Sequence, residues 1–202
     1  MSGGHDIVGV TREITLELVE QAYRHAVFPM AAPEYEVFTW HRPDPRAIIP
    51  LDGFHIPRRL RRTLRSNRFE VTFDTAFRRV MRGCAAGRPV WIGKEFFDLY
   101  GRLHHLGKAH SVEVWREGHL AGGLYGVHLG AAFFAESKFH RDRDASKVAL
   151  ASLLLHLRDQ GFDLLEVQYL TSHLAQFVPM TIPDREYVRR LSRALERDCP
   201  FL

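Results

Sequence analysis

The sequence predicts an α+β fold, and two observations support this class. First, three consecutive segments alternate apolar and polar side chains with the period of a strand, separated by short turn signals; they are residues 110–116, 119–127 and 131–139. Second, this meander is followed by a helical segment that begins at Asp144 or Ser146 and ends at Gly161, and then by a buried strand over residues 162–170. An antiparallel meander, a helix and a further strand form the layers of an α+β domain.

The N-terminal part is expected to form a small domain over residues 1–52, followed by a second domain over residues 53–202. Residues 14–26 carry apolar side chains at helical spacing, with Thr15 as the N-cap. Residues 28–52 concentrate prolines around aromatic side chains, which favours short strands and turns over long helices. The other predicted elements before the meander are helices over 57–68, 75–84 and 95–106 and a strand over 69–73.

Composition excludes the membrane and fibrous classes. The chain has 202 residues, 46% of them apolar and 26% charged, the balance of an ordinary globular protein. The longest nearly uncharged stretch, 120–135, contains four glycines and is shorter than the ~20 residues that span a bilayer. Residues 1–10 lack an export signal, so we expect a cytoplasmic protein. Cys84 and Cys199 are widely separated and are expected to be reduced thiols.

Residues 57–68 form a dense basic segment with no acid among them. Six of these twelve residues are arginine: Arg58, Arg59, Arg61, Arg62, Arg65 and Arg68. At helical spacing, Arg58, Arg61, Arg62 and Arg65 share one face. Guanidinium groups at this density repel one another unless a polyanion neutralises them, so the segment favours phosphate binding. The alternative is a solvated helix face with local acidic partners.

Two strands place polar side chains where they could form a site. Glu166 and Gln168 share one face of their predicted strand, and Glu136 and Lys138 share one face of theirs. Burying the two carboxylates among so many aromatic residues is unfavourable unless each is paired or hydrogen-bonded, which is typical of functional sites. The alternative is that either glutamate lies on an exposed face of an antiparallel sheet.

Other motifs are weaker. Ser137 and Ser146 lack the GxSxG context of a serine hydrolase. The histidines of HHLGKAH, residues 104–110, lack the spacing of a zinc site. The glycines of GGLYG, residues 122–126, lack the lysine of a phosphate loop and are more typical of bulges or close backbone contacts in a strand.

Several segments together resemble the leucyl/phenylalanyl-tRNA-protein transferase family. They are HAVFPM, PDPRAIIPLDGFHIPRRLRRTLR, FEVTFDTAFRRVMRGCA, AHSVEVW, GGLYGV, FFAESKFH, DASKVAL and LLEVQYLTSHLAQF, and they occur in the order of the family from about residue 19 to 187. The resemblance implies a small N-terminal domain and an acetyltransferase-like (GNAT) C-terminal domain with a mixed, largely antiparallel sheet.

It also implies an activity. Members of this family move leucine, phenylalanine or methionine from aminoacyl-tRNA to the N-terminal α-amine of proteins that begin with Arg or Lys, which marks these proteins for degradation by the N-degron pathway. The implied partners are aminoacyl-tRNA and such proteins or peptides, without a membrane. No metal or nucleotide cofactor is implied, and we expect a monomer.

The family's functional residues carry over to positions in this sequence. Glu166, Gln168 and Glu136 match the catalytic positions. The implied substrate-binding residues are Trp91, Met30, Leu124, Phe133, Lys138 and Leu165. The implied tRNA-binding residues are Arg58, Arg59, Arg61, Arg62 and Arg65. In the expected mechanism Gln168 orients the incoming amine, Glu166 polarises Gln168 or accepts its proton, backbone donors steady the oxyanion, and Glu136 holds a cationic group.

The sequence departs from the family pattern at three places. Glu166 replaces an aspartate, Lys138 replaces a methionine within residues 135–139, and residues 175–179 read AQFVP. A pair between Lys138 and Glu136 would make the donor pocket smaller and more polar, which favours a smaller or more polar donor amino acid.

Two other functions are alternatives to this transfer activity. A divergent paralogue could bind tRNA, or use another donor, without the transfer activity. An acetyl-CoA-dependent acetyltransferase is disfavoured, because the sequence lacks a glycine-rich pyrophosphate loop before a helix.

Overall fold

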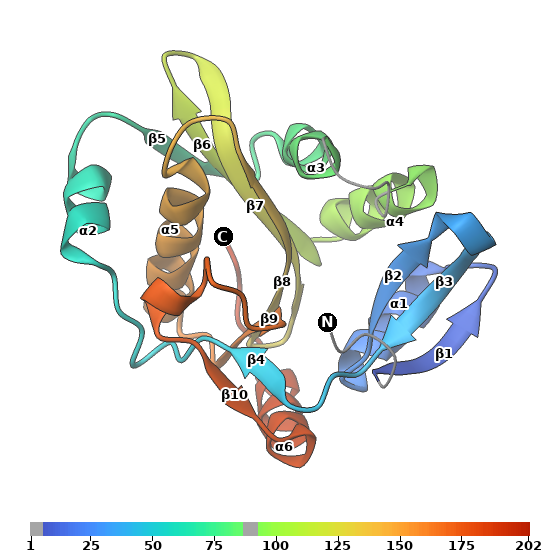
Figure 1. Ribbon diagram of the computed structural model, residues 1–202. Coiled ribbons are helices and arrows are strands. Elements are labelled where there is room, and N and C mark those ends of the chain that lie inside the picture. Colours follow the sequence, from blue (N-terminus) through green and yellow to red (C-terminus); the bar gives the residue numbers. More distant parts are fainter. Residues whose placement is uncertain (1–5, 87–92) are drawn as a thin grey trace.

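A computed structural model describes residues 6–86 and 93–202 and confirms the α+β class (Figure 1). In the described residues the larger sheet has seven strands in the order β10-β4-β9-β8-β7-β6-β5. All neighbours are antiparallel except β8 and β9, which run parallel, so the sheet is mixed and largely antiparallel. Its strands are β4 (Arg46–Ile48), β5 (Glu70–Phe73), β6 (Ala109–Arg116), β7 (His119–Leu129), β8 (Ala132–His140), β9 (Leu164–Gln168) and β10 (Met180–Ile182).

A smaller sheet precedes it, with the strand order β1-β3-β2. These strands are β1 (Ile7–Thr11), β2 (Phe28–Ala32) and β3 (Val37–His41), with the short helix η1 (Pro33–Tyr35) between β2 and β3. Helix α1 (Leu16–Arg24) begins after Thr15, whose side chain accepts a hydrogen bond from the backbone N–H of Leu18. This cap confirms the predicted start of the helix.

Helices cover both faces of the larger sheet (Figure 1). One face packs against α5 (Ala145–Gln160), with α2 (Arg58–Arg65) outside it, and the other packs against α3 (Phe77–Ala85) and α4 (Lys94–His105). Helix α6 (Asp184–Leu195), which follows the short helix η2 (Ala175–Phe177), contacts β8 and β9. Gly161 ends α5 in the left-handed conformation, with φ of 81°, as the sequence predicts.

The division into two domains with a boundary after residue 52 stays a prediction. Residues 46–48 fall within the predicted N-terminal domain and form β4, which is bonded to β9 and β10 in the larger sheet. The smaller sheet ends at His41.

Strands β8 and β9 part after a short stretch of pairing. Their register runs from the pair Ala132 and Leu164 to the pair Phe134 and Glu166. Strand β8 then continues to His140 and β9 ends at Gln168. This separation opens the sheet next to the predicted catalytic residues.

A β-bulge in β8 shifts the alternation of its side chains between the two faces of the sheet. Ala135 pairs with Gly126 and Ser137 pairs with Tyr125, which leaves Glu136 as the extra residue. A Cβ at Gly126 would overlap the carbonyl oxygen of Phe134, so glycine permits the close approach here, as predicted for GGLYG.

Because of the bulge, the prediction that Glu136 and Lys138 share one face of their strand is wrong. Glu136 hydrogen-bonds to Tyr23 of α1, on the face covered by α1 and α4. Lys138 pairs in register with Leu124, whose neighbour Tyr125 contacts the ring of Tyr100 on α4, so Leu124 and Lys138 face the opposite side, toward α5. Glu136 and Lys138 therefore lie on opposite faces of the strand, because the extra residue reverses the alternation.

Candidate functional site

A cleft lies where β8 and β9 part. Its volume is about 160 Å³. Its wall combines four consecutive residues of β8, the end of β9, and residues of β7, α5 and the segment after β9: Leu124, Ala135, Glu136, Ser137, Lys138, Leu150, Val167, Gln168, Tyr169, Thr171 and Leu174. Two of the three predicted catalytic residues, Glu136 and Gln168, thus meet in one hollow although they are distant in sequence.

Glu136 is held by phenol groups from two helices. Tyr23 Oη donates a hydrogen bond of 2.6 Å to Glu136 Oε1, and Tyr23 Oη lies 2.8 Å from Tyr100 Oη. Burial raises the pKa of Glu136 to about 8, although the hydrogen bond from Tyr23 acts in the opposite direction. With this pKa the carboxyl group is largely protonated at neutral pH.

Gln168 completes this network from the other strand. Its Nε2 donates to Glu136 Oε1 over 3.2 Å, which leaves its side-chain carbonyl oxygen for another donor. The backbone of Gln168 has φ of 61°, a left-handed conformation that is unfavourable for a residue other than glycine. Its N–H donates to Glu166 Oε1 over 3.0 Å, and this bond stabilises the unusual backbone.

Glu166 is fully buried and paired with an arginine that the sequence analysis did not assign. Arg46 Nη1 donates to Glu166 Oε1 over 3.0 Å, and both side chains are 1% exposed. The second guanidinium nitrogen donates to the carbonyl oxygen of Ala26, and the group lies over the rings of Phe28 and Tyr187 at 5.3 and 4.5 Å. Burial raises the pKa of Glu166, and the charge of Arg46 opposes that effect.

The two glutamates contact different parts of Gln168. Glu166 Oε1 accepts a hydrogen bond from its backbone N–H, and Glu136 Oε1 accepts one from its side-chain amide. The expected mechanism has Glu166 polarising the side chain of Gln168, and this role stays a prediction.

The six predicted substrate-binding residues lie in different parts of the protein. Leu124 and Lys138 line the cleft. Phe133 and Leu165 are fully buried in the core, where Phe133 stacks on Phe201 with 5.5 Å between ring centroids. Met30 lies on β2 and its carbonyl oxygen accepts a hydrogen bond from Thr39. Trp91 lies outside the described residues.

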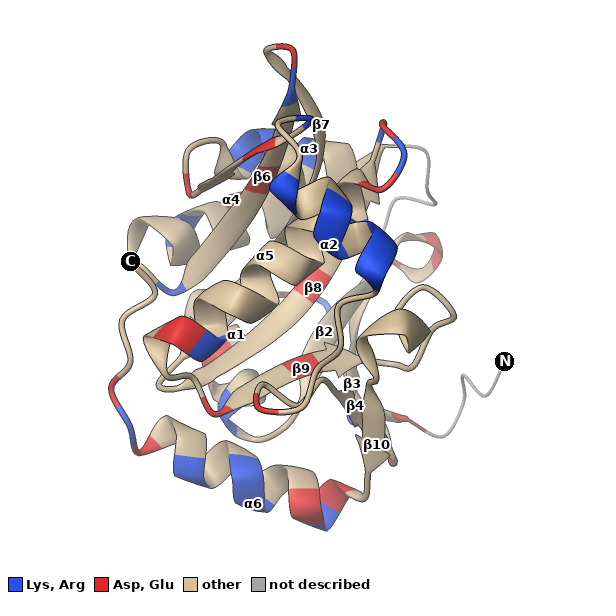
Figure 2. Ribbon diagram, turned by 90° about the vertical axis from the view of Figure 1, so that its left-hand side faces the viewer, with Lys and Arg blue, Asp and Glu red and all other residues tan. Residues whose placement is uncertain are grey.

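The basic segment forms α2 as predicted, and this helix lies at the surface, outside α5 (Figure 2). Leu60 is buried and Arg58, Arg59, Arg61, Arg62 and Arg65 are exposed. Four of these arginines line a groove of about 580 Å³ together with His55. Within residues 6–86 and 93–202, no carboxylate lies within 4.0 Å of these guanidinium groups. The alternative of local acidic partners is therefore not observed there.

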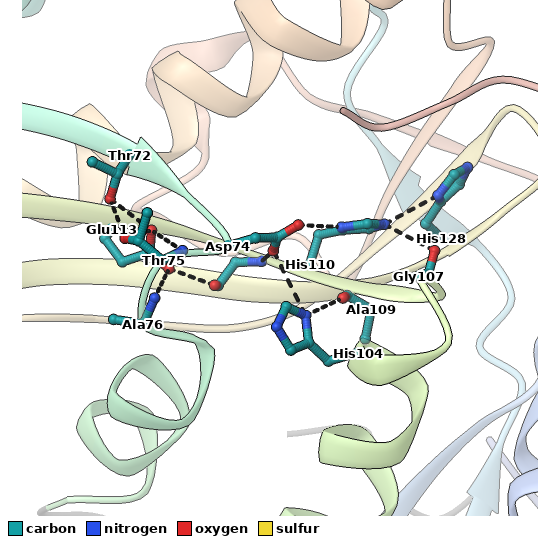
Figure 3. Close-up of polar contacts among 11 residues, drawn as sticks. Thr72, Asp74, Thr75, Ala76, His104, Gly107, Ala109, His110, Glu113 and His128 are labelled. Atoms are coloured by element: carbon teal, nitrogen blue, oxygen red, sulfur yellow. Dashed lines mark hydrogen bonds and ion pairs between the residues drawn. The ribbon is translucent and has the colours of Figure 1, made fainter.

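A second polar cluster lies at the start of α3 (Figure 3). Asp74 accepts from the backbone N–H of Ser111 and lies 2.6 Å from His110 Nδ1, and His110 lies 3.3 Å from His128. Glu113 accepts hydrogen bonds from the backbone N–H groups of Thr75 and Ala76, immediately before α3. Among the described residues no group of three or more His, Cys, Asp or Glu is arranged to hold a metal ion. This cluster fixes α3 against β6.

We expect the Glu136→Gln variant to gain stability relative to the wild type as pH rises from about 4.5 to about 8. In this range the unfolded chain releases the proton of Glu136 while the folded protein keeps it, so the wild type loses up to about 1.4 kcal/mol per pH unit. Glutamine does not titrate. Urea unfolding of both proteins at several pH values measures this difference, with the exposed Glu196→Gln as the control for loss of a carboxylate. A difference that stays constant with pH would contradict the buried, proton-holding state of Glu136.

The cleft with its carboxyl–amide pair, together with the exposed arginines of α2, indicates the class of the protein: an α+β enzyme with a polar cleft and a surface suited to a polyanion.

Comparison with known proteins identifies the family. The family described as Leucyl/phenylalanyl-tRNA protein transferase matches residues 48–192. The chain is 49% identical over 184 residues to the leucyl/phenylalanyl-tRNA–protein transferase of Salinibacter ruber, covering 91% of this chain and 81% of that one. It is 48% identical over 188 residues to that of Gloeobacter violaceus, covering 93% and 97%. The chain belongs to the leucyl/phenylalanyl-tRNA protein transferase family, and the resemblance inferred from the sequence is confirmed.

Solved structures include similar chains as well. A ribosomal-protein-alanine N-acetyltransferase from Brucella melitensis is similar with a TM-score of 0.38 and 13% identity, over 54% of this chain and 84% of that one. In the described part of this chain, no helix is both long and apolar enough to cross a membrane.

Proposed function

We propose that the protein transfers an amino acid of the leucine, phenylalanine or methionine class from aminoacyl-tRNA to the N-terminal α-amine of proteins that begin with Arg or Lys. The observation that carries this proposal is the hydrogen-bonded pair of Gln168 and Glu136 in the cleft, at 3.2 Å, in a chain of this family. The modified proteins would then enter the N-degron pathway. The protein would act as a monomer in the cytoplasm, where its donor is made.

The reaction is the aminolysis of an ester, which needs two substrates held together and one proton moved. The amine nitrogen attacks the carbonyl carbon, a C–N bond forms, and the C–O bond to the terminal ribose breaks. The amine loses a proton and the ribose oxygen gains one. The free side-chain oxygen of Gln168 would accept a hydrogen bond from the amine, and Glu136 would exchange the proton.

Glu136 suits proton exchange better than the cation binding expected from the resemblance. With its pKa raised to about 8, the neutral carboxyl group predominates at pH 7. A neutral carboxyl attracts an ammonium group much less than a carboxylate does. Tyr23 and Tyr100 would keep the group oriented through their linked hydroxyls.

A transfer assay tests the proposed function. The purified protein is mixed with tRNA charged with labelled leucine, phenylalanine or methionine and with a peptide that begins with Arg. We expect label in the peptide, and we expect none when the peptide's α-amine is acetylated. Binding of tRNA without transfer of any donor would instead identify the divergent paralogue considered above.

The exposed arginines of α2 are predicted to bind tRNA phosphates. Replacing Arg58, Arg61, Arg62 and Arg65 with Gln should weaken tRNA binding and flatten its salt dependence by about 0.7 to 0.9 log units per lost phosphate contact. Titration of labelled tRNA at several salt concentrations measures the slope. Peptide binding should stay unchanged, and an unaltered slope would show that α2 is a solvated face.

A further inference from the structure

A second hollow adjoins the cleft and is built from cationic and hydrogen-bonding groups. It has a volume of about 440 Å³, within the roughly 300–1,000 Å³ of ordinary ligand sites. It shares Lys138 and Thr171 with the cleft, so the two hollows adjoin at these residues. Its polar wall is formed by Lys138, His140, Arg141, Ser146, Thr171 and His173. No carboxylate is among the described residues that line it. We refer to it as the β8–α5 groove.

Two elements that line the β8–α5 groove also contact the basic segment. Ser146, in the first turn of α5, lines the groove, and α2 packs on the same helix. The loop after β8, which carries Arg141, meets the end of the basic segment, because the guanidinium group of Arg68 donates to the carbonyl oxygen of Arg143 over 3.4 Å. The groove and the basic segment therefore share α5 and this loop as neighbours.

Arg141 is the most prominent charge of the groove. Its side chain is exposed, and its guanidinium carbon lies 5.6 Å from the centre of the Phe139 ring. The neighbouring carboxylate of Asp142 is bonded to Arg116 and His119. Within the described residues no carboxylate lies within 4.0 Å of the Arg141 guanidinium group. Its charge is therefore available to an anionic ligand.

We propose that the β8–α5 groove holds the unpaired 3′-terminal nucleotides of the donor tRNA, with Arg141 bound to a phosphate. This inference rests on the proposed function and extends it. The acceptor arm of tRNA ends in single-stranded nucleotides, and these must span the distance from the duplex to the cleft. Proteins bind single-stranded nucleic acid in cationic grooves that follow its backbone. A peptide that begins with Arg or Lys carries the same sign of charge as the groove and is disfavoured there.

The test compares two donors that differ in their phosphates. One is aminoacyl-tRNA, and the other is adenosine carrying the same amino acid as a 3′ ester, which has no phosphate. In Arg141→Gln, the KM for aminoacyl-tRNA should rise roughly tenfold, as for the loss of about one charged hydrogen bond. The slope of log affinity for tRNA against log salt concentration should become less steep by about 0.7. The kinetics with the adenosine ester should stay at the wild-type level, which also shows that the variant is folded.

Two further variants sharpen the test. Arg141→Lys should recover much of the affinity, because it keeps the charge. Arg193→Gln, which removes an exposed charge of α6 outside the groove, should behave as the wild type with both donors. The proposal is overturned if Arg141→Gln affects both donors equally, affects neither, or raises the KM of the acceptor peptide alone.

Failure of the proposed function gives a different result. In that case the wild type transfers from neither donor. Binding of uncharged tRNA still tests the groove, because Arg141→Gln should then weaken this binding and reduce its salt slope while Arg193→Gln leaves both unchanged. Equal binding by all three proteins would overturn the proposal.

Discussion

Replacing Gln168 with alanine should lower turnover at saturating donor and acceptor by at least about 100-fold, with little change in tRNA affinity. Gln168 is the group that reaches across the cleft to Glu136, at 3.2 Å, and its free oxygen faces the place of the incoming amine in the proposed mechanism. Its loss removes an interaction needed for reaction and leaves the surface of α2 intact. Single-turnover rates and tRNA titration measure the two quantities separately.

A matched control removes an amide elsewhere. Gln21 is exposed on α1, and Gln21→Ala should leave both the rate and the tRNA affinity unchanged. Near wild-type turnover of Gln168→Ala would show that the amide has no part in the reaction. A large loss of tRNA affinity in that variant would instead point to a role in binding.

Replacing Arg46 with methionine should reduce the free energy of unfolding by about 3–5 kcal/mol, because it leaves the carboxylate of Glu166 buried without its charged partner. The loss is large against a typical total stability of about 5–15 kcal/mol. The change also removes the bond to the carbonyl oxygen of Ala26 and the packing between Phe28 and Tyr187. Urea unfolding at low temperature measures the effect.

Two comparisons isolate the buried pair. Arg42 and Asp184 form a pair of 2.6 Å whose side chains are 38% and 22% exposed, so Arg42→Met should cost only about 1 kcal/mol or less. Adding Glu166→Gln to Arg46→Met should recover part of the stability, because the uncompensated charge disappears. Equal losses of unfolding free energy in Arg42→Met and Arg46→Met would contradict the burial of the pair between Arg46 and Glu166.

The sequence predicts the elements whose patterns are local. The meander, the helix ended by Gly161 and the basic helix α2 occur where periodicity and capping place them. Strand β10 was missed because it has three residues and depends on pairing with β4, a contact that no local pattern shows. Strand β1 and helix α6 were also not predicted. Helix α6 is strongly charged, and its burial rests on a few residues such as Tyr187 and Leu191.

The contacts among the three predicted catalytic residues follow only partly from the sequence. Glu136, Glu166 and Gln168 came from strand alternation and the family resemblance, and the structure brings them into one network. The bulge at Glu136 was invisible because alternation assumes regular pairing. The pairing of Arg46 with Glu166 could not be predicted, because the two residues are 120 positions apart and no local pattern shows their contact.

The extra residue in β8 also determines which side chains of this strand can change independently. Both residues line the cleft, but Glu136 bonds Tyr23 on the side of α1 and α4, whereas Lys138 pairs with Leu124 on the side of α5. A substitution at residue 138 is therefore expected to leave the hydrogen bonds of Glu136 to Tyr23 and Gln168 in place. Deleting one residue of the bulge would have the opposite effect, because the side chains on one side of the deletion would change faces of the sheet together. This strand should thus tolerate a change of side chain at residue 138 better than a change of chain length.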